Sequence, residues 1–150
     1  MNKLSKEQIN DIAQNIDCGQ KSFWNSRTFE ILTLPDFDTQ DASDFEDLYA
    51  EDLQKLEKNA SDFHEIERPG SSDSFRFMEE FAENLPSKLQ LKARLFNALS
   101  QRNPFRFFKY EVDNSGPYRQ AWFDFKQQKL EEWVEMKFEQ IVKELDDAQG

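Results

Sequence analysis

Residues 103–110 read Asn-Pro-Phe-Arg-Phe-Phe-Lys-Tyr, and after one turn residues 118–126 read Tyr-Arg-Gln-Ala-Trp-Phe-Asp-Phe-Lys. Bases are interleaved with aromatic rings here, inside a chain whose formal net charge is −11. Residues 88–129 hold nine Lys and Arg against three acids, whereas residues 36–67 hold twelve acids and two lysines. Such segregation produces two surfaces of opposite potential, and each can attract a partner, an anion or the other surface.

A helix start is predicted at Asn103, because asparagine is a favoured N-cap and the proline that follows fits the first helical position. In that helix Phe105 and Phe108 share one face, and Arg106 and Lys109 share the adjacent one. We expect the rings to pack inward and the two bases to point outward together, where they could bind phosphate or carboxylate. A structural alternative is that the bases pair with acids of a neighbouring helix and hold the domain together.

The candidate ligand-binding residues are four bases of this region: Arg102, Arg106, Lys109 and Arg119. They predict a non-enzymatic binding or adaptor module whose basic patch receives an acidic protein segment or a small anion. Nucleic acid is a third kind of ligand to weigh, because aromatic rings stack on bases and cations meet phosphate. The net charge of −11 repels a polyanion, and no nucleic-acid-binding motif is present, so nucleic acid is disfavoured.

The acidic segment offers an alternative function, in which the protein blocks a basic partner as an immunity protein or antitoxin does. Its candidate residues are Asp44, Glu46, Asp47, Glu51 and Asp52. Co-purification with a basic toxin or nuclease would favour this alternative over the basic patch. Homo-oligomer formation is also left open, because opposite patches on one chain can pair between two copies.

Catalytic and metal-binding signatures are sparse, since the chain has one histidine, one cysteine and no glycine-rich phosphate loop. His64 would need an orienting carboxylate to act as a general base, and we expect it to be a solvated surface residue. The carboxylates of residues 36–41 lack the glycine and the closing glutamate of an EF-hand loop. We expect no catalytic residue, no cofactor and no metal site, although an enzyme with perturbed carboxylates in a cleft is left open.

Chain length and composition favour one folded domain of 150 residues. Hydrophobic residues make up only 37% of the chain, but aromatic residues reach 14%, and each buried ring hides about 150–250 Å². The N-terminus has no apolar signal core, and no run of about 18 apolar residues could span a membrane. We therefore expect a cytoplasmic protein without a membrane segment.

The N-terminal half carries signals for both helix and strand. A capping box at Ser5 opens a short amphipathic helix that ends at Gly19, and residues 21–24 and 29–34 form a β-hairpin that Pro35 stops. A second capping box at Ser43 opens an acidic helix, and residues 64–67 could add a third strand. The acidic helix is expected to bury one stripe: Phe45, Leu48, Tyr49, Leu53 and Leu56.

The C-terminal half predicts helices only. One starts after Ser72 and carries an apolar stripe from Phe75 to Ala82, and a second opens at Pro86. A brief third begins at residue 104 and ends at 114–117, and the last runs for about 30 residues. The fold class is therefore α+β and mainly helical. We expect an N-terminal β-hairpin, with three short strands if residues 64–67 pair, packed with a C-terminal helical bundle.

Four segments, residues 74–82, 94–99, 104–109 and 122–125, resemble an uncharacterised bacterial protein family, UPF0158, in their order and spacing. The family pattern has Leu-x-x-Ala-Leu, a polar turn, Phe-Arg-x-Phe-Lys and, a dozen residues on, a tryptophan. Here the chain departs from the family at residues 103–104 and by a longer acidic insertion at residues 36–47. The resemblance implies a bacterial cytoplasmic protein with a helical C-terminal half, and no established activity. The matching positions are Leu95, Ala98, Leu99, Phe105, Arg106, Phe108, Lys109 and Trp122.

Overall fold

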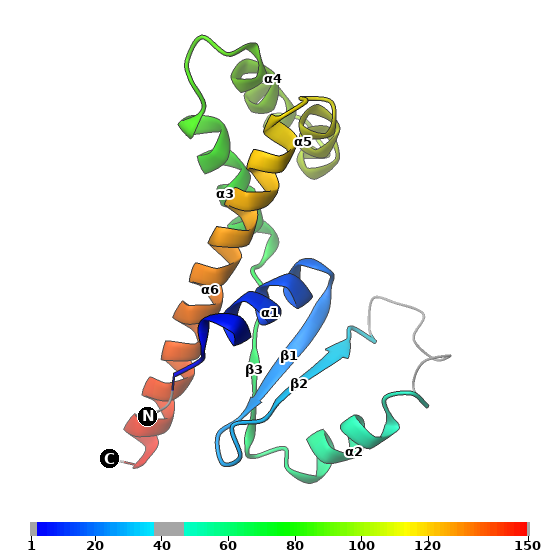
Figure 1. The fold of residues 1–150 in the computed structure, drawn as a ribbon, viewed down its shortest axis with the longest axis vertical. Helices are drawn as coiled ribbons and strands as arrows, with labels where there is room; N and C mark the ends of the chain where they lie inside the picture. Colours follow the sequence, from blue (N-terminus) through cyan, green and yellow to red (C-terminus); the bar gives the residue numbers. More distant parts are fainter. Residues whose placement is uncertain (1–2, 38–46, 150) are drawn as a thin grey trace. The chain divides into compact units, whose positions relative to one another are not determined.

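The computed structural model describes residues 3–37 and 47–149. These residues form six helices and three strands, so the protein is α+β and mainly helical, as predicted (Figure 1). The chain divides into two compact units, the first formed by residues 1–68 with 130–150 and the second by residues 69–129. The last helix, α6 (Tyr118–Gln149), contributes residues to both units. The single domain expected from chain length stays a prediction.

The first unit is built on a small antiparallel sheet. Strands β1 (Gln20–Asn25), β2 (Ile31–Pro35) and β3 (Phe63–Ile66) are arranged in the order β2-β1-β3, which confirms both the hairpin and the third strand. Central strand β1 buries Trp24, whose side chain meets Phe138 of α6 edge to face at 4.8 Å between ring centroids. The sheet therefore packs against the C-terminal part of α6 within this unit.

Helix α1 (Lys6–Asp17) follows the sequence signals closely. The Ser5 and Gln8 side chains form the expected capping box, and the helix buries Ile9, Ile12, Ala13 and Ile16 on one face. Gly19 has a φ of 83°, a left-handed conformation that glycine adopts without steric cost, and the chain turns there into β1. Helix α1 then packs against β1 within the first unit.

The hairpin loop is longer than the four residues that the sequence predicts. Asn25 Oδ1 accepts hydrogen bonds from the backbone N–H groups of Arg27 and Thr28, and this Asx turn forms the loop. Phe29 belongs to the loop and not to β2, with a φ of 64° that is rare for a bulky residue. Its ring stacks on Trp24 at 6.0 Å between centroids and remains 55% exposed.

The acidic helix begins later than predicted. Helix α2 spans Ala50–Lys58, and Leu48 precedes it in a turn with 75% of its surface exposed. Within α2, Leu53 and Leu56 are only half-buried, so the expected buried stripe is wrong for the described residues. A helix that starts at residue 50 cannot align Leu48 with the later leucines. The predicted cap at Ser43, with Phe45, lies outside the described residues.

A buried ion pair closes the end of the sheet. Asp36 follows β2 with a side chain that is 3% exposed, and Arg68 donates a 2.6 Å hydrogen bond to its Oδ2. Arg68 also donates to the carbonyl oxygen of Gly19, and Lys21 Nζ lies 3.9 Å from the Asp36 carboxylate. This network joins three chain segments of the first unit, and it explains why a charged residue is buried there.

The second unit is entirely helical. It consists of α3 (Ser71–Asn84), α4 (Gln90–Leu99), α5 (Pro104–Asp113) and the start of α6. Helix α4 begins at residue 90 and not at Pro86, because residues 86–89 form a turn that places Leu89 against the core. The end of α5 near Gly116 and the length of α6, 32 residues, agree with the prediction. The core contains Met78, Phe81, Ala82, Leu85, Leu91, Leu95, Ala98, Leu99, Phe108, Val112 and Trp122.

Candidate functional site

Helix α5 of the second unit carries the basic aromatic stretch. Asn103 is its N-cap, although the asparagine side chain makes no capping hydrogen bond, and Pro104 is at the first position. Phe108 is 1% exposed and meets Trp122 edge to face at 4.9 Å. Phe105 is 43% exposed, so the expectation that both rings pack inward is wrong for this residue. Only the face that carries Phe108 and Val112 is turned to the core.

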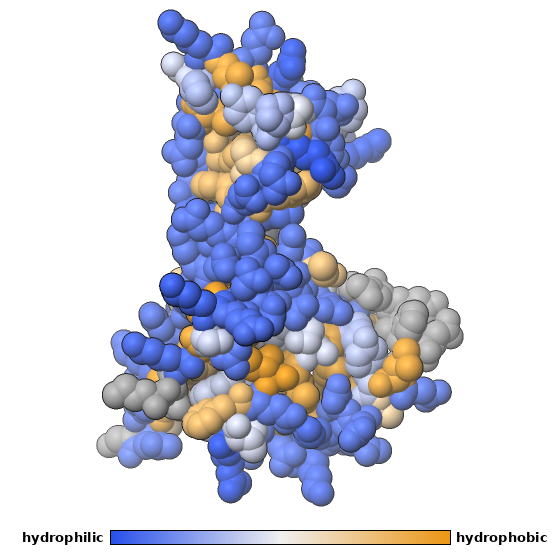
Figure 2. All heavy atoms as spheres, in the orientation of Figure 1, coloured by the Kyte–Doolittle hydropathy of each residue, from blue (hydrophilic) through white to orange (hydrophobic). Residues whose placement is uncertain are grey.

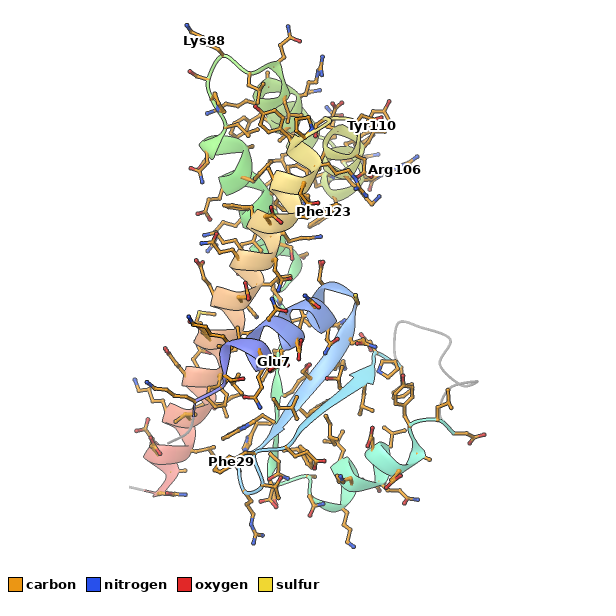
Figure 3. The ribbon with its side chains drawn as sticks, viewed as in Figure 1. Glu7, Phe29, Lys88, Arg106, Tyr110 and Phe123 are labelled. Atoms are coloured by element: carbon orange, nitrogen blue, oxygen red, sulfur yellow. The ribbon has the colours of Figure 1, made fainter. Side chains whose placement is uncertain are left out.

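The outer face of α5 presents two rings and a base to solvent. Phe107 is 42% exposed and Tyr110 is 64% exposed. Tyr110 follows Arg106 by four positions and Phe107 by three, so it is a helical neighbour of both. Figure 3 shows Arg106 and Tyr110 pointing away from α5. Arg102, directly before the helix, is also exposed. We call these four residues the basic aromatic surface: Arg102, Arg106, Phe107 and Tyr110.

Two of the four predicted bases have no charged partner among the described residues. Within the described part of the chain, the side chains of Arg102 and Arg106 form neither a hydrogen bond nor an ion pair. In the hydropathy view of Figure 2, apolar side chains in the second unit lie beside strongly hydrophilic ones. Unpaired guanidinium groups beside exposed rings can take a carboxylate and an apolar group together.

The other two predicted bases share one acid. Lys109 Nζ lies 2.8 Å from Asp113 Oδ2, and Arg119 Nε lies 3.2 Å from Asp113 Oδ1. The Arg119 guanidinium also stacks on the Phe123 ring, at 4.6 Å from its centroid. For Lys109 and Arg119 the structure therefore agrees with the alternative of internal pairing, although Lys109 pairs within its own helix. It brings these two predicted residues together at Asp113, and neither Arg102 nor Arg106 takes part in that network.

Sequence reasoning missed Asp113, Phe107 and Tyr110. Asp113 follows Lys109 by four positions, and this spacing on a helix is itself a signal for an ion pair. The pKa of the Asp113 carboxyl lies below its ordinary value, mainly because Lys109 donates a hydrogen bond to it, with a further contribution from Arg119. Phe107 and Tyr110 are exposed because they lie on other sides of the helix than Phe108, which faces the core.

We expect replacement of Lys109 by alanine to raise the pKa of Asp113 towards its ordinary value. The hydrogen bond that favours the charged carboxylate is lost, whereas Arg119 remains. A carboxyl whose folded pKa is depressed contributes stability above its unfolded pKa and loses it as pH falls, so this contribution shrinks in the variant. Carbon-detected NMR titration of the Asp113 side chain measures the change. An unchanged titration would show that the ion pair does not form in solution.

The residues of the acidic alternative are only partly described. Asp44 and Glu46 lie outside the described residues, whereas Asp47 is exposed in the turn before α2. Glu51 and Asp52 are in the first turn of α2, where acids are favoured by the helix dipole, and Glu51 is exposed. Exposed Leu48 lies among them, so this surface has an apolar centre as well as its charge.

His64 is not the solvated surface residue that we expected. It lies in β3, opposite Trp24 of β1, and its ring is half-buried at 6.3 Å from the Trp24 ring. Its Nε2 atom is shielded from solvent and has no hydrogen-bond partner among the described residues. Burial follows from pairing with the central strand. No carboxylate among the described residues accepts a hydrogen bond from this nitrogen to orient the ring. The part of the chain that the structure covers also shows no group of three metal-ligating side chains.

The first unit contains an open cavity of about 570 Å³ between the N-terminal residues and the end of α6. Its floor includes Ile9 and Phe138, which are buried, and its rim carries more acids than bases. An anion would meet repulsion at this rim, so the cavity does not compete with the basic aromatic surface for an acidic ligand. The lining residues are Lys3, Leu4, Ile9, Glu135, Phe138, Glu139, Val142, Lys143, Asp146 and Asp147.

The fold and this surface define a mainly helical α+β protein with an exposed basic aromatic helix. The chain matches the model of an uncharacterised protein family, UPF0158, over residues 4–146, and it belongs to that family. The resemblance seen in the sequence is thereby confirmed. No curated protein and no solved structure matches the chain significantly. Across residues 3–37 and 47–149, no helix offers a stretch long and apolar enough to cross a bilayer.

Proposed function

We propose that this protein is a non-enzymatic binding module of the bacterial cytoplasm, and that its basic aromatic surface receives an acidic segment of a protein. One observation carries the proposal: Arg102 and Arg106 have no acidic partner among the described residues, although the chain has thirty acids. Lys109 and Arg119, in contrast, are satisfied internally. Positive charge left unpaired in an acidic protein is available to a ligand.

The exposed rings favour a protein segment over a small anion. Phosphate would use the guanidinium groups alone, whereas Phe107 and Tyr110 offer apolar area that a peptide side chain can cover. Arginine and tyrosine are also the residue types that dominate the energy of protein interfaces. The ligand that fits is therefore an extended or helical segment that combines Asp or Glu with an apolar side chain.

A binding experiment tests this proposal on the full chain. The probe is a short synthetic peptide of unrelated sequence that carries several Glu residues around one Phe and one Leu. We expect its addition to shift the backbone amide signals of residues 102–113 in NMR spectra. Replacing Arg102 and Arg106 together by alanine should weaken binding at least about tenfold, because the peptide carboxylates then lose their guanidinium partners.

Lys88→Ala is the matched control, since Lys88 is an exposed base of the same unit, placed away from Arg106 in Figure 3. It should bind the probe as the unaltered chain does. A version of the peptide with Lys in place of Glu should not bind. Equal affinity for inorganic phosphate and the peptide would make the ligand a small anion, and no shift at residues 102–113 with either probe would refute the proposal.

A further inference from the structure

We propose that the acidic segment is supplied by a second copy of this chain, and that residues 47–52 of one copy contact the basic aromatic surface of the other. This inference rests on the proposed function, because it names the occupant of the same surface. Residues 47–52 read Asp-Leu-Tyr-Ala-Glu-Asp, with three acids and no base. The segment thus combines acidic and apolar side chains, as the proposed ligand of the basic aromatic surface does.

Leu48 is the centre of the proposed contact. It is 75% exposed, the largest exposed fraction among the large apolar residues that the structure describes, and it lies before α2 in a turn. Exposed Asp47 precedes it, and exposed Glu51 follows within the first turn of α2. An apolar side chain flanked by carboxylates is complementary to rings flanked by guanidinium groups, so Leu48 can cover a ring while the acids meet the bases.

Neither half of this contact is fully paired among the described residues of its own unit, although Lys55 attracts Glu51 within α2. Among the described residues, Asp47 and Glu51 form no ion pair, and neither do Arg102 and Arg106. Both halves occur once in every copy, so two copies related by a two-fold axis can make the contact twice. A second copy is also present at the same concentration as the surface that it occupies, which is not assured for any other partner.

The net charge of −11 opposes association but does not prevent it. At physiological ionic strength the field of an exposed charge is screened within about 8 Å, so the repulsion between two acidic chains is weakened at longer range. Charges in direct contact are screened least. The local pairing of Arg102 and Arg106 with Asp47 and Glu51 can therefore decide whether two copies associate.

Sedimentation of the full chain over a series of concentrations tests the inference. We expect the mass to rise with concentration from 17.8 kDa towards twice that value. A variant with Arg102→Glu and Arg106→Glu should remain monomeric, and so should a variant with Asp47→Lys and Glu51→Lys. An equimolar mixture of these two variants should associate again, because each reversed surface then meets a reversed segment.

Lys88→Glu and Asp146→Lys are the matched controls, since both residues are exposed and lie outside the proposed contact. They should associate as the unaltered chain does, and circular dichroism checks that every variant is folded. If a reversed variant fails to fold, Arg106→Gln and Glu51→Gln should each weaken association. A monomer at all concentrations, or a dimer that both reversals leave intact, overturns the inference. The synthetic peptide still tests the proposed function separately.

Discussion

Replacement of Phe108 by alanine should lower the free energy of unfolding of the second unit by about 3–5 kcal/mol, as truncation of a buried phenylalanine does. The ring is 1% exposed, and it packs edge to face on Trp122, which also contacts Phe81. Removing it leaves a cavity where α5 and α6 meet. Urea unfolding followed by tryptophan fluorescence measures the loss, with Trp122 in direct contact with the altered position.

Phe105→Ala is the matched control on the same helix and with the same change in side chain. Phe105 is 43% exposed, so its loss removes less buried area and should cost below about 1 kcal/mol. Phe108→Leu should fall between the two variants, because leucine refills part of the cavity. Equal effects of the two alanine variants would contradict the burial difference that separates these rings.

Replacement of Asp36 by alanine should destabilise the first unit by about 2–3 kcal/mol. The value is below the 3–5 kcal/mol typical of a fully buried pair, because the Arg68 side chain is 31% exposed and water compensates part of its charge. Arg68 would lose its 2.6 Å hydrogen bond and Lys21 its neighbouring carboxylate. Urea unfolding followed by circular dichroism provides the measurement.

Asp62→Ala provides the comparison for this prediction. Asp62 pairs with Arg27 at 3.9 Å, and the Arg27 side chain is 78% exposed, so solvent screens the pair. We expect a change below about 1 kcal/mol, as for exposed ion pairs in general. If Asp36→Ala lowered the free energy of unfolding no more than Asp62→Ala does, the Asp36 network would contribute no more stability than an exposed ion pair.

The candidate site was predictable only in part. The sequence places four bases in one region, and the local spacing of apolar residues there predicts helices with an exposed face. It did not distinguish Arg106 from Lys109, because both are expected on outward faces of the same helix. The distinction depends on Asp113, which takes Lys109 and Arg119 as partners. Pairing between side chains is settled by distances that hydropathy patterns do not encode.

Caps and the helical and strand periods by themselves determined α1, the hairpin and the long final helix, because these are local properties of the chain. They left the third strand open, because its pairing with β1 joins segments that are distant in sequence. The tertiary structure alone decided that Phe108 is buried while Phe105 is exposed, that Asp36 joins Arg68, and that Leu48 is exposed. Each of these outcomes depends on which segments distant in sequence pack together. Packing selects among faces that local periodicity leaves equivalent, and so it also selects which bases are available for binding.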